Sequence, residues 1–238
     1  MNFGIIAAGQ GSRLVQEGIP LPKPLVIIDS RPMIGRLIDI FIKCGAESLC
    51  VIVNEEMKEV AKFLTELAPS LPCSFDLIVK TTPTSMHSFY ELSRIMEGKG
   101  RYIITTVDTI FREEDFHNYV EAFEKAPSEI DGVMAVTTFI DDEKPLYVAT
   151  DADNRITGFL DKYEDGVKYV SGGIYGLGQS AIPVLKKCLE AGVGRMRNYQ
   201  RALVEAGLWL QAYDMNKIID VDHAADIATA EKFLSDKD

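Results

Sequence analysis

The chain has 238 residues, of which 47% are hydrophobic and 26% are charged. This composition excludes an intrinsically disordered chain, and no apolar run approaches the roughly 18 residues that a membrane span needs. The 25 basic and 36 acidic residues give a net charge of −11, so no general attraction for nucleic acid exists. We therefore expect a globular protein with no membrane or nucleic-acid partner, which captures any phosphate ligand at a local basic site.

Strands and helices alternate along the first part of the chain. A short apolar run that stops at Gly9 is typical of a buried strand, and an amphipathic segment between Pro32 and Gly45 predicts a helix. Such alternation predicts parallel strands with ligands at their carboxyl ends. The expected strands are 3–8, 49–53, 75–79 and 101–107, and the further expected helices are 55–67 and 86–96.

The pattern changes in the second part, where turn residues separate short strands. We expect antiparallel or mixed pairing there, followed by a return of helices. No linker or repeat interrupts the chain, so we predict a single α/β domain over residues 1–238 with a mostly parallel, mixed central sheet. The expected strands are 132–140, 146–150, 155–161, 168–177, 209–213 and 218–221, and the expected helices are 180–190, 196–205 and 224–233.

The four cysteines contain no Cys-x-x-Cys pair and no histidine at zinc-finger spacing. We interpret them as reduced, mostly buried thiols, with a disulfide as the less favoured alternative. The first residues lack a basic segment followed by a cleavable apolar stretch, so we predict no signal peptide and a cytoplasmic location. The cysteines are Cys44, Cys50, Cys73 and Cys188.

A glycine-rich loop follows the first predicted strand, Ala7-Ala8-Gly9-Gln10-Gly11-Ser12-Arg13-Leu14. Two glycines let backbone N–H groups approach phosphate oxygens, while Ser12 adds a hydroxyl and Arg13 a planar set of donors. The two glycines by themselves are also explained by a tight turn that binds no ligand. The loop with Arg13 is a more specific indication of an anion site.

Lys23 lies between two prolines, so a stiff backbone presents its ammonium group. A fixed positive charge suits negative charge that develops during a reaction. The dinucleotide fingerprint needs a third glycine where Leu14 stands, and no Gly-Lys-Ser/Thr P-loop occurs. We therefore exclude a P-loop and disfavour a nicotinamide-dependent oxidoreductase.

Asp108 follows the predicted strand 101–107. A carboxylate at the carboxyl end of a strand, facing a phosphate loop, suits Mg²⁺, which prefers carboxylates, substrate oxygens and water. The alternative role is the cap of a following helix. We predict that Asp108 is a metal ligand.

Residues 6–14 and Pro22-Lys23-Pro24-Leu25 together resemble the signature of the sugar-1-phosphate nucleotidylyltransferases. The resemblance to this family extends over nearly the whole chain. The resemblance implies a Rossmann-like three-layer α/β sandwich with a small β elaboration on the acceptor side. Residues 1–125 would then form the nucleotide-binding half and residues 126–238 the acceptor-binding half. It also implies roles for individual residues. Ala8, Gly9, Gly11 and Ser12 would bind nucleotide, and Arg13 and Lys23 would be catalytic.

The resemblance implies a second metal ligand just before the helix expected at 224–233. Asp222 is the better match and Asp220 the alternative, although Asp222 also suits a helix cap. We expect His223 to flank the site rather than to bind metal, because Mg²⁺ prefers oxygen ligands.

Four acceptor-binding residues are implied by the same resemblance: Asp161, Lys162, Ser171 and Gly172. The family usually has Glu-Lys where this chain has Asp161-Lys162, and asparagine where it has Ser171. These departures predict an atypical acceptor. A plain strand with a glycine bulge explains residues 170–175 equally well.

Residues 82–89 occupy the segment where the family reads the base, so Ser85 and Ser88 are candidate nucleotide-binding residues; Ser85 as a helix cap is the alternative. This run resembles cytidylyltransferases acting on phosphocholine more than the sugar enzymes. Tyr163, Tyr169 and Tyr175 would then bind choline by cation–π contacts, although aromatic strand residues are usually core.

We predict that an acceptor phosphate attacks the α-phosphorus of a nucleoside triphosphate and releases pyrophosphate, with Mg²⁺ as cofactor, in a monomer or homodimer. A phosphocholine-type cytidylyltransferase is the alternative. A glycosyltransferase using Asp220-Val221-Asp222 or Asp151-Ala152-Asp153, and a catalytically silent nucleotide-binding module, are the rivals from other classes.

Overall fold

The computed structural model describes residues 1–140 and 144–236. Its main sheet has nine strands, seven of them in the order β10-β9-β11-β6-β1-β4-β5, with β8 paired to β11 and β12 paired to β8. Their bounds are β1 (Asn2–Ala7), β4 (Ser48–Val53), β5 (Ser74–Val79), β6 (Tyr102–Thr106), β8 (Gly132–Thr137), β9 (Tyr147–Thr150), β10 (Ile156–Leu160), β11 (Tyr169–Leu177) and β12 (Leu210–Asp214).

The two parts of this sheet differ in strand direction. β6, β1, β4 and β5 are parallel, whereas β11 runs antiparallel to β6, β8 and β9. Two small ladders join β2 (Ile27–Ile28) to β3 (Arg31–Pro32) and β7 (Thr109–Ile110) to β13 (Ile219–Asp220). The predicted α/β class with a mixed, mostly parallel sheet is therefore confirmed.

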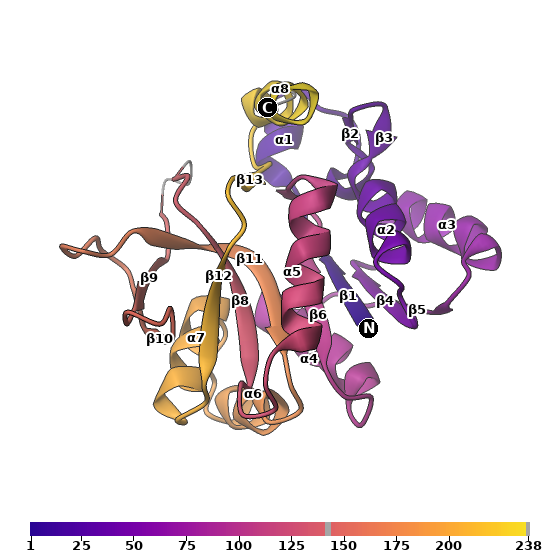
Figure 1. Cartoon of the computed structure of the whole chain (residues 1–238). Helices are drawn as coiled ribbons and strands as arrows, with labels where there is room; N and C mark the ends of the chain where they lie inside the picture. The colour runs from indigo at the N-terminus through magenta and orange to yellow at the C-terminus, as the bar shows by residue number, and fades with distance from the viewer. Residues whose placement is uncertain (141–143, 237–238) are drawn as a thin grey trace.

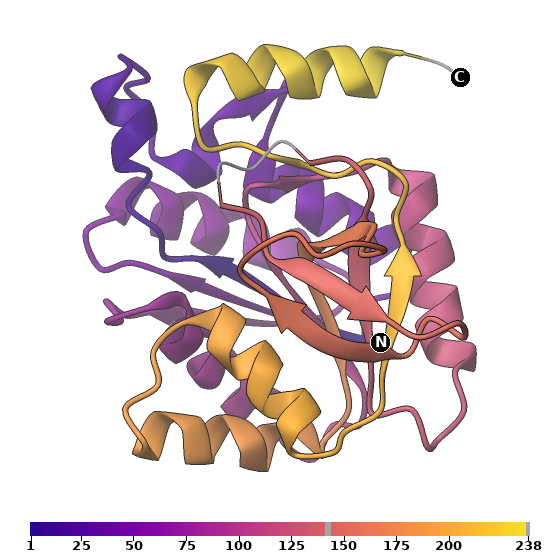
Figure 2. The same cartoon turned by 90° about the vertical axis from the view of Figure 1, so that its left-hand side faces the viewer.

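Helices cover both faces of the sheet (Figures 1 and 2). Neighbouring residues of β1 belong to different hydrophobic clusters: Ile5 to the one that includes residues of α2, α3, α5 and α8, and Ile6 to the one that includes residues of α4, α6 and α7. The helices are α1 (Ser12–Gln16), α2 (Met33–Lys43), α3 (Lys58–Leu67), α4 (Ser85–Met96), α5 (Glu113–Lys125), α6 (Ala181–Glu190), α7 (Met196–Glu205) and α8 (Ala224–Ser235), with short 3₁₀ turns at Lys23–Leu25 and Ala68–Ser70.

Helix α5 was absent from the sequence-based prediction. Its signals are present: three acidic residues in the first turn, and buried apolar residues at a spacing of three and four. The buried residues are Phe116, Tyr119, Val120 and Phe123. Two predicted ends were also wrong, because α3 begins at Lys58 rather than at residue 55, and β8 ends at Thr137 rather than at residue 140.

Strands β1 and β6 place the loops that follow them next to each other. Every residue of β1 is buried, and Ile6 lies opposite Thr106 in the parallel ladder. The chain leaves both strands at the same edge of the sheet, so the glycine-rich loop and Asp108 emerge side by side.

The four cysteines are free, and Cys50 and Cys188 are buried. Burial raises the pKa of the Cys50 thiol to about 12, so this sulfur stays protonated and unreactive at neutral pH. Within the described residues, no helix combines the length and the apolar character needed to cross a bilayer.

Candidate active site

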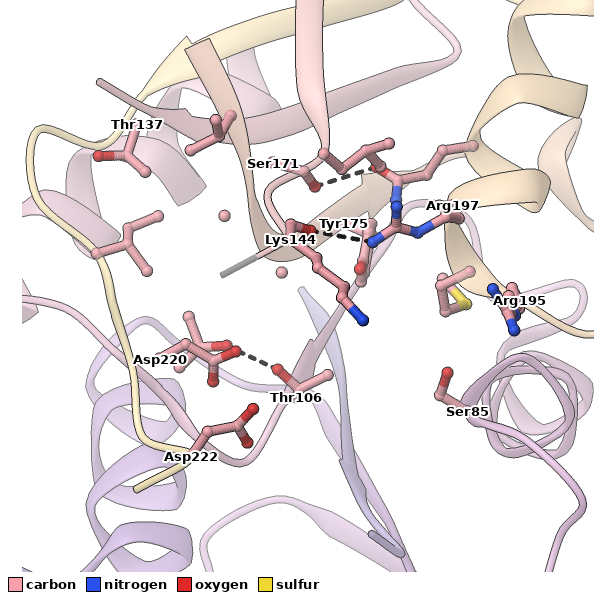
Figure 3. Close-up of a pocket in the computed structure, with 18 of the residues that line it drawn as sticks. Ser85, Thr106, Thr137, Lys144, Ser171, Tyr175, Arg195, Arg197, Asp220 and Asp222 are labelled. Carbon is pink, nitrogen blue, oxygen red and sulfur yellow. Dashed lines mark hydrogen bonds between the residues drawn. The ribbon is translucent and has the colours of Figure 1, made fainter. Parts of the chain in front are cut away.

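A cavity of about 580 Å³ lies over the carboxyl ends of the central strands. Its lining comes from both parts of the chain, including Thr106 at the end of β6, Ser171 and Gly172 in β11, and Arg197 in α7. Figure 3 shows Asp220 and Asp222 on one side of this cavity and Arg195 and Arg197 on the other.

The glycine-rich loop packs directly onto Lys23. Gly11 has a φ of +60°, and a Cβ added there would lie 2.8 Å from the Cβ of Lys23. Both the conformation and the space therefore demand glycine. A Cβ added at Gly9 would meet nothing within 4 Å, and Ala8 and Gly9 come directly after β1.

Lys23 is 6% exposed and lies at the start of the 3₁₀ turn Lys23–Leu25. Its Nζ is 2.5 Å from Asp108 Oδ2 and 2.6 Å from Asp222 Oδ1. Burial alone would lower the pKa of this ammonium, but its ion pairs with the two carboxylates outweigh burial and raise the pKa above the usual value. Lys23 is therefore a fixed positive charge.

Asp222 connects three segments of the chain. Besides Lys23, its carboxylate contacts Arg13 Nη1 at 2.7 Å. Burial would raise the pKa of Asp222, but the hydrogen bond and charge of Lys23 and the charge of Arg13 lower it, so the group is ionised at neutral pH. The predicted meeting of Asp108 and Asp222 is thus present in the structure.

Asp220 joins the same group of carboxylates. Asp108, Asp220 and Asp222 each offer an oxygen within 4.8 Å of the others. Asp222 is not the helix cap, because His223 occupies that position and Asp226 accepts hydrogen bonds from the backbone N–H groups of Asp222 and His223. Both candidates for a second metal ligand therefore face Asp108.

A contact between α1 and α8 holds this end of the cavity together. Glu17 accepts hydrogen bonds from the Ala224 backbone N–H at 2.6 Å and pairs with His223 Nδ1 at 2.6 Å. His223 is therefore engaged with Glu17, and its expected place beside the metal site rather than in it stays a prediction.

The predicted acceptor residues divide between two cavities. Ser171 and Gly172 line the main one, where Ser171 Oγ donates to Gln200 Oε1 at 3.1 Å. Asp161 and Lys162 instead line a second, adjoining cavity of about 600 Å³. Both residues follow the end of β10, and their role in acceptor binding stays a prediction.

Ser85 lines the main cavity, but Ser88 does not. Ser88 lies on the inner face of α4, is 1% exposed, and hydrogen bonds through its hydroxyl to Thr82 Oγ1 at 2.6 Å. A direct contact between Ser88 and a ligand is therefore a wrong expectation; the residue supports Thr82 instead. Ser12 lies on a third cavity beside Gln10, not on the main one.

The three tyrosines considered for choline do not form one cage. Tyr175 lines the main cavity, Tyr163 lines the second cavity, and Tyr169 lies in the core. Arg195 and Arg197 were missed by the sequence analysis. The run Gly194-Arg195-Met196-Arg197, which enters a helix with no acidic residue in its first turn, was a detectable signal.

Comparison with known proteins agrees with this architecture. The chain is 26% identical over 176 residues to a mannose-1-phosphate guanyltransferase from Hypocrea jecorina, covering 72% of this chain and 48% of that protein. It is 22% identical over its whole length to the bifunctional protein GlmU of Thermodesulfovibrio yellowstonii, covering 53% of that protein. The chain thus spans about half the length of these curated relatives.

A solved structure of similar size shares the fold. The crystal structure described as a putative glucose-1-phosphate thymidylyltransferase from Bacillus anthracis in complex with a sucrose superposes with a TM-score of 0.84 and 22% identity, over 100% of this chain and 96% of that one. The Nucleotidyl transferase family matches residues 4–236 of this sequence. With the match extending over almost the entire chain, this protein belongs to the Nucleotidyl transferase family.

Proposed function

We propose that this protein transfers a nucleotidyl group from a nucleoside triphosphate to the phosphate of a small acceptor, in the class of the sugar-1-phosphates, and releases pyrophosphate. The observation that carries this proposal is the buried Lys23, held by Asp108 and Asp222 against the glycine-rich loop. The named relatives, which include a mannose-1-phosphate guanyltransferase, support a sugar phosphate as acceptor.

The nucleotide would lie along the loop after β1. Backbone N–H groups near Ala8, Gly9 and Gly11 would face its phosphates, Arg13 would bind the triphosphate tail, and Ser85 would approach the nucleoside. The acceptor would occupy the space beside Ser171 and Gly172. Lys162 remains a candidate for contacts farther out, from the second cavity.

The cluster formed by the carboxylates of Asp108, Asp220 and Asp222 fits Mg²⁺. All three of its members offer oxygen, the ligand that Mg²⁺ prefers, and they approach one another within 4.8 Å. Asp108 and Asp222 would hold the ion, with Asp220 as the nearest further carboxylate. When bound, the ion supplies positive charge that neutralises phosphate oxygens.

The reaction needs no general base, because an acceptor phosphate is already an anion. The work of this chain is to align the acceptor oxygen with the α-phosphorus and to neutralise charge there. Lys23 can do this because its neighbours keep it protonated and its backbone is fixed. Arg13 would orient the leaving pyrophosphate, while Asp222 holds the Arg13 guanidinium in place at 2.7 Å.

One rival function loses a candidate site in this structure. Asp151 accepts backbone hydrogen bonds from Asp153 and Arg155 and so forms the turn between β9 and β10. An Asp-x-Asp metal pair for a glycosyltransferase therefore has no support at residues 151–153. Asp220 and Asp222 remain, and there the neighbouring Lys23 and Arg13 favour a triphosphate substrate.

The test is an assay with nucleoside triphosphates labelled on either the α- or the γ-phosphate. Each of the common triphosphates is combined with hexose-1-phosphates, amino-sugar phosphates and phosphocholine, with and without Mg²⁺. We expect the α-label in an acceptor-linked product and the γ-label in pyrophosphate, for one pair of substrates.

The matched variants are Asp108→Asn, which should remove this activity, and Lys187→Ala, a change of an exposed lysine on α6 that should leave it intact. Transfer of the γ-label to the acceptor would identify a kinase instead. Transfer of sugar from a nucleotide-sugar without pyrophosphate would identify a glycosyltransferase, and either result would overturn the proposal.

A further inference from the structure

The two ends of the main cavity carry opposite charges. Asp220 and Asp222 line one end, whereas Lys144, Arg195 and Arg197 line the other end (Figure 3). Lys23 and Arg13 contact Asp222 at the first end. The basic end stands out in a chain whose net charge is −11. A concentration of positive charge in a cavity attracts an anionic ligand.

The start of α7 strengthens this positive end. Arg195 is the N-cap of α7, Arg197 is in its first turn, and that turn contains no acidic residue. Cations near a helix N-terminus are unfavourable, because the backbone N–H groups there already carry partial positive charge. A bound anion would offset this unfavourable charge, because it can accept hydrogen bonds from the guanidinium groups and from the helix N–H groups at the same time.

The side chains of Arg195 and Arg197 differ in how many partners they have within the protein. Arg197 Nη1 donates to Asp161 at 2.7 Å and Nη2 to the Lys144 carbonyl at 3.1 Å, which fixes its guanidinium at the cavity wall. Arg195 has no side-chain hydrogen bond or ion pair with any residue that the structure describes. One arginine is therefore held in position and its neighbour is available to a ligand.

The adjoining second cavity continues the positive surface. The described residues that line it include five cationic side chains and one carboxylate, that of Asp161. Asp161 is already engaged, because Arg201 as well as Arg197 binds it. The acidic residues 141–143, which precede Lys144, lie outside the described residues. The five cations are Lys144, Lys162, Arg195, Arg197 and Arg201.

We propose that the acceptor carries a second anionic group, a carboxylate or a second phosphate, which binds Arg195 and Arg197 at the start of α7 while its reacting phosphate faces Lys23. This inference rests on the proposed function, since it specifies the acceptor of that reaction. It disfavours phosphocholine, because the trimethylammonium group of choline would meet like charge at this end of the cavity. Plain hexose-1-phosphates offer no second anion to Arg195, which has no partner among the described residues, or to the free donor capacity of Arg197.

The test compares ligands that differ only by the second anion. Glucose-1-phosphate is compared with glucuronic acid-1-phosphate and with glucose-1,6-bisphosphate, and glycerol-3-phosphate is compared with 3-phosphoglycerate. Affinities are measured by titration calorimetry on the full chain without nucleoside triphosphate, so that turnover is not needed. We expect at least one doubly anionic ligand to bind about 10-fold or more tightly than its parent, the gain typical of charged hydrogen bonds.

The variants Arg195→Ala and Arg195→Ala/Arg197→Ala should reduce this ratio to near one without weakening the parent ligands, while Lys187→Ala should preserve it. Preference for the carboxylate or for the bisphosphate identifies the second group. Equal affinities within each ligand set, or a preference that survives in the double variant, would overturn the inference. Failure of the proposed function is distinguishable, because it would appear as absent pyrophosphate release whatever the binding preference.

Discussion

The two ends of the main cavity are built in contrasting ways. At the acidic end, one buried lysine is braced by carboxylates from two distant segments, and a third segment contributes Arg13. At the basic end, Arg195 and Arg197 come from one helix start and are at least partly accessible. Buried, cross-braced charges suit a step that requires fixed geometry, whereas accessible charges on one helix suit the choice between ligands.

Lys23→Ala should have the largest effect. The variant removes the fixed charge next to the expected site of attack, so we predict a loss of about 10²- to 10³-fold in turnover with the fold retained. Pyrophosphate release measures turnover, and circular dichroism checks the fold. Activity within several-fold of the wild type would break the assignment of chemistry to the acidic end.

Asp222→Asn should weaken metal binding. It removes one carboxylate from the group and the charge that holds Lys23 and Arg13. We predict that Mn²⁺ binding in the presence of nucleoside triphosphate falls by at least about 10-fold, a loss that follows even from removing a residue that only orients a metal ligand. Asp165→Asn, at an exposed position, is the control. Unchanged Mn²⁺ affinity would leave Asp220 as the second ligand beside Asp108.

Gly11→Ala should destabilise the protein, because alanine disfavours a φ of +60° and its methyl group would lie 2.8 Å from Lys23 Cβ. We predict a loss of at least about 1 kcal/mol in the free energy of unfolding, measured by urea denaturation. Gly9→Ala is the matched control, since nothing lies within 4 Å of that position. Equal stability of the two variants would show that the loop does not need this close packing.

Asp161→Asn should have the smallest effect and act at the basic end alone. Neutralising Asp161 releases Arg201 and Arg197, so doubly anionic ligands should bind about twofold to fivefold more tightly in calorimetry. Hydrogen bonds from Arg201 and Arg197 lower the pKa of Asp161, so the carboxylate remains charged as the pH falls from 7 to 5. In the wild type, lowering the pH from 7 to 5 should therefore not tighten the binding of doubly anionic ligands. Weaker binding of these ligands by Asp161→Asn would contradict the proposed effect of Asp161 on the arginines.

The parts of the site that the sequence predicted well depend on local backbone rules. A strand followed by glycines, and a lysine between prolines, each specify a conformation within a few residues, and the structure shows Gly11 against Lys23 as a result. The meeting of Asp108 with Asp222 came from family resemblance. It could not follow from residue spacing, because their separation in space depends on how β13 pairs with β7.

The surroundings of Ser88 and Asp161 depend on which way each side chain points. Ser88 falls on the buried side of α4, and Asp161 lies one residue beyond β10, where its side chain reaches Arg197 and Arg201. A shift of one residue changes the face in a strand and rotates the direction in a helix. The basic end was missed because the residue pattern at the start of α7 does not show which cavity Arg195 and Arg197 line.

The contact of Glu17 with His223 and Ala224 has a consequence for the order in which the protein is made. The glycine-rich loop leaves the ribosome early, yet its bracing partners arrive about two hundred residues later. A nascent chain that ends before β13 would present Arg13 and Lys23 without Asp222. The bracing of Arg13 and Lys23 is therefore completed only when translation has reached α8, even though both residues were synthesised first.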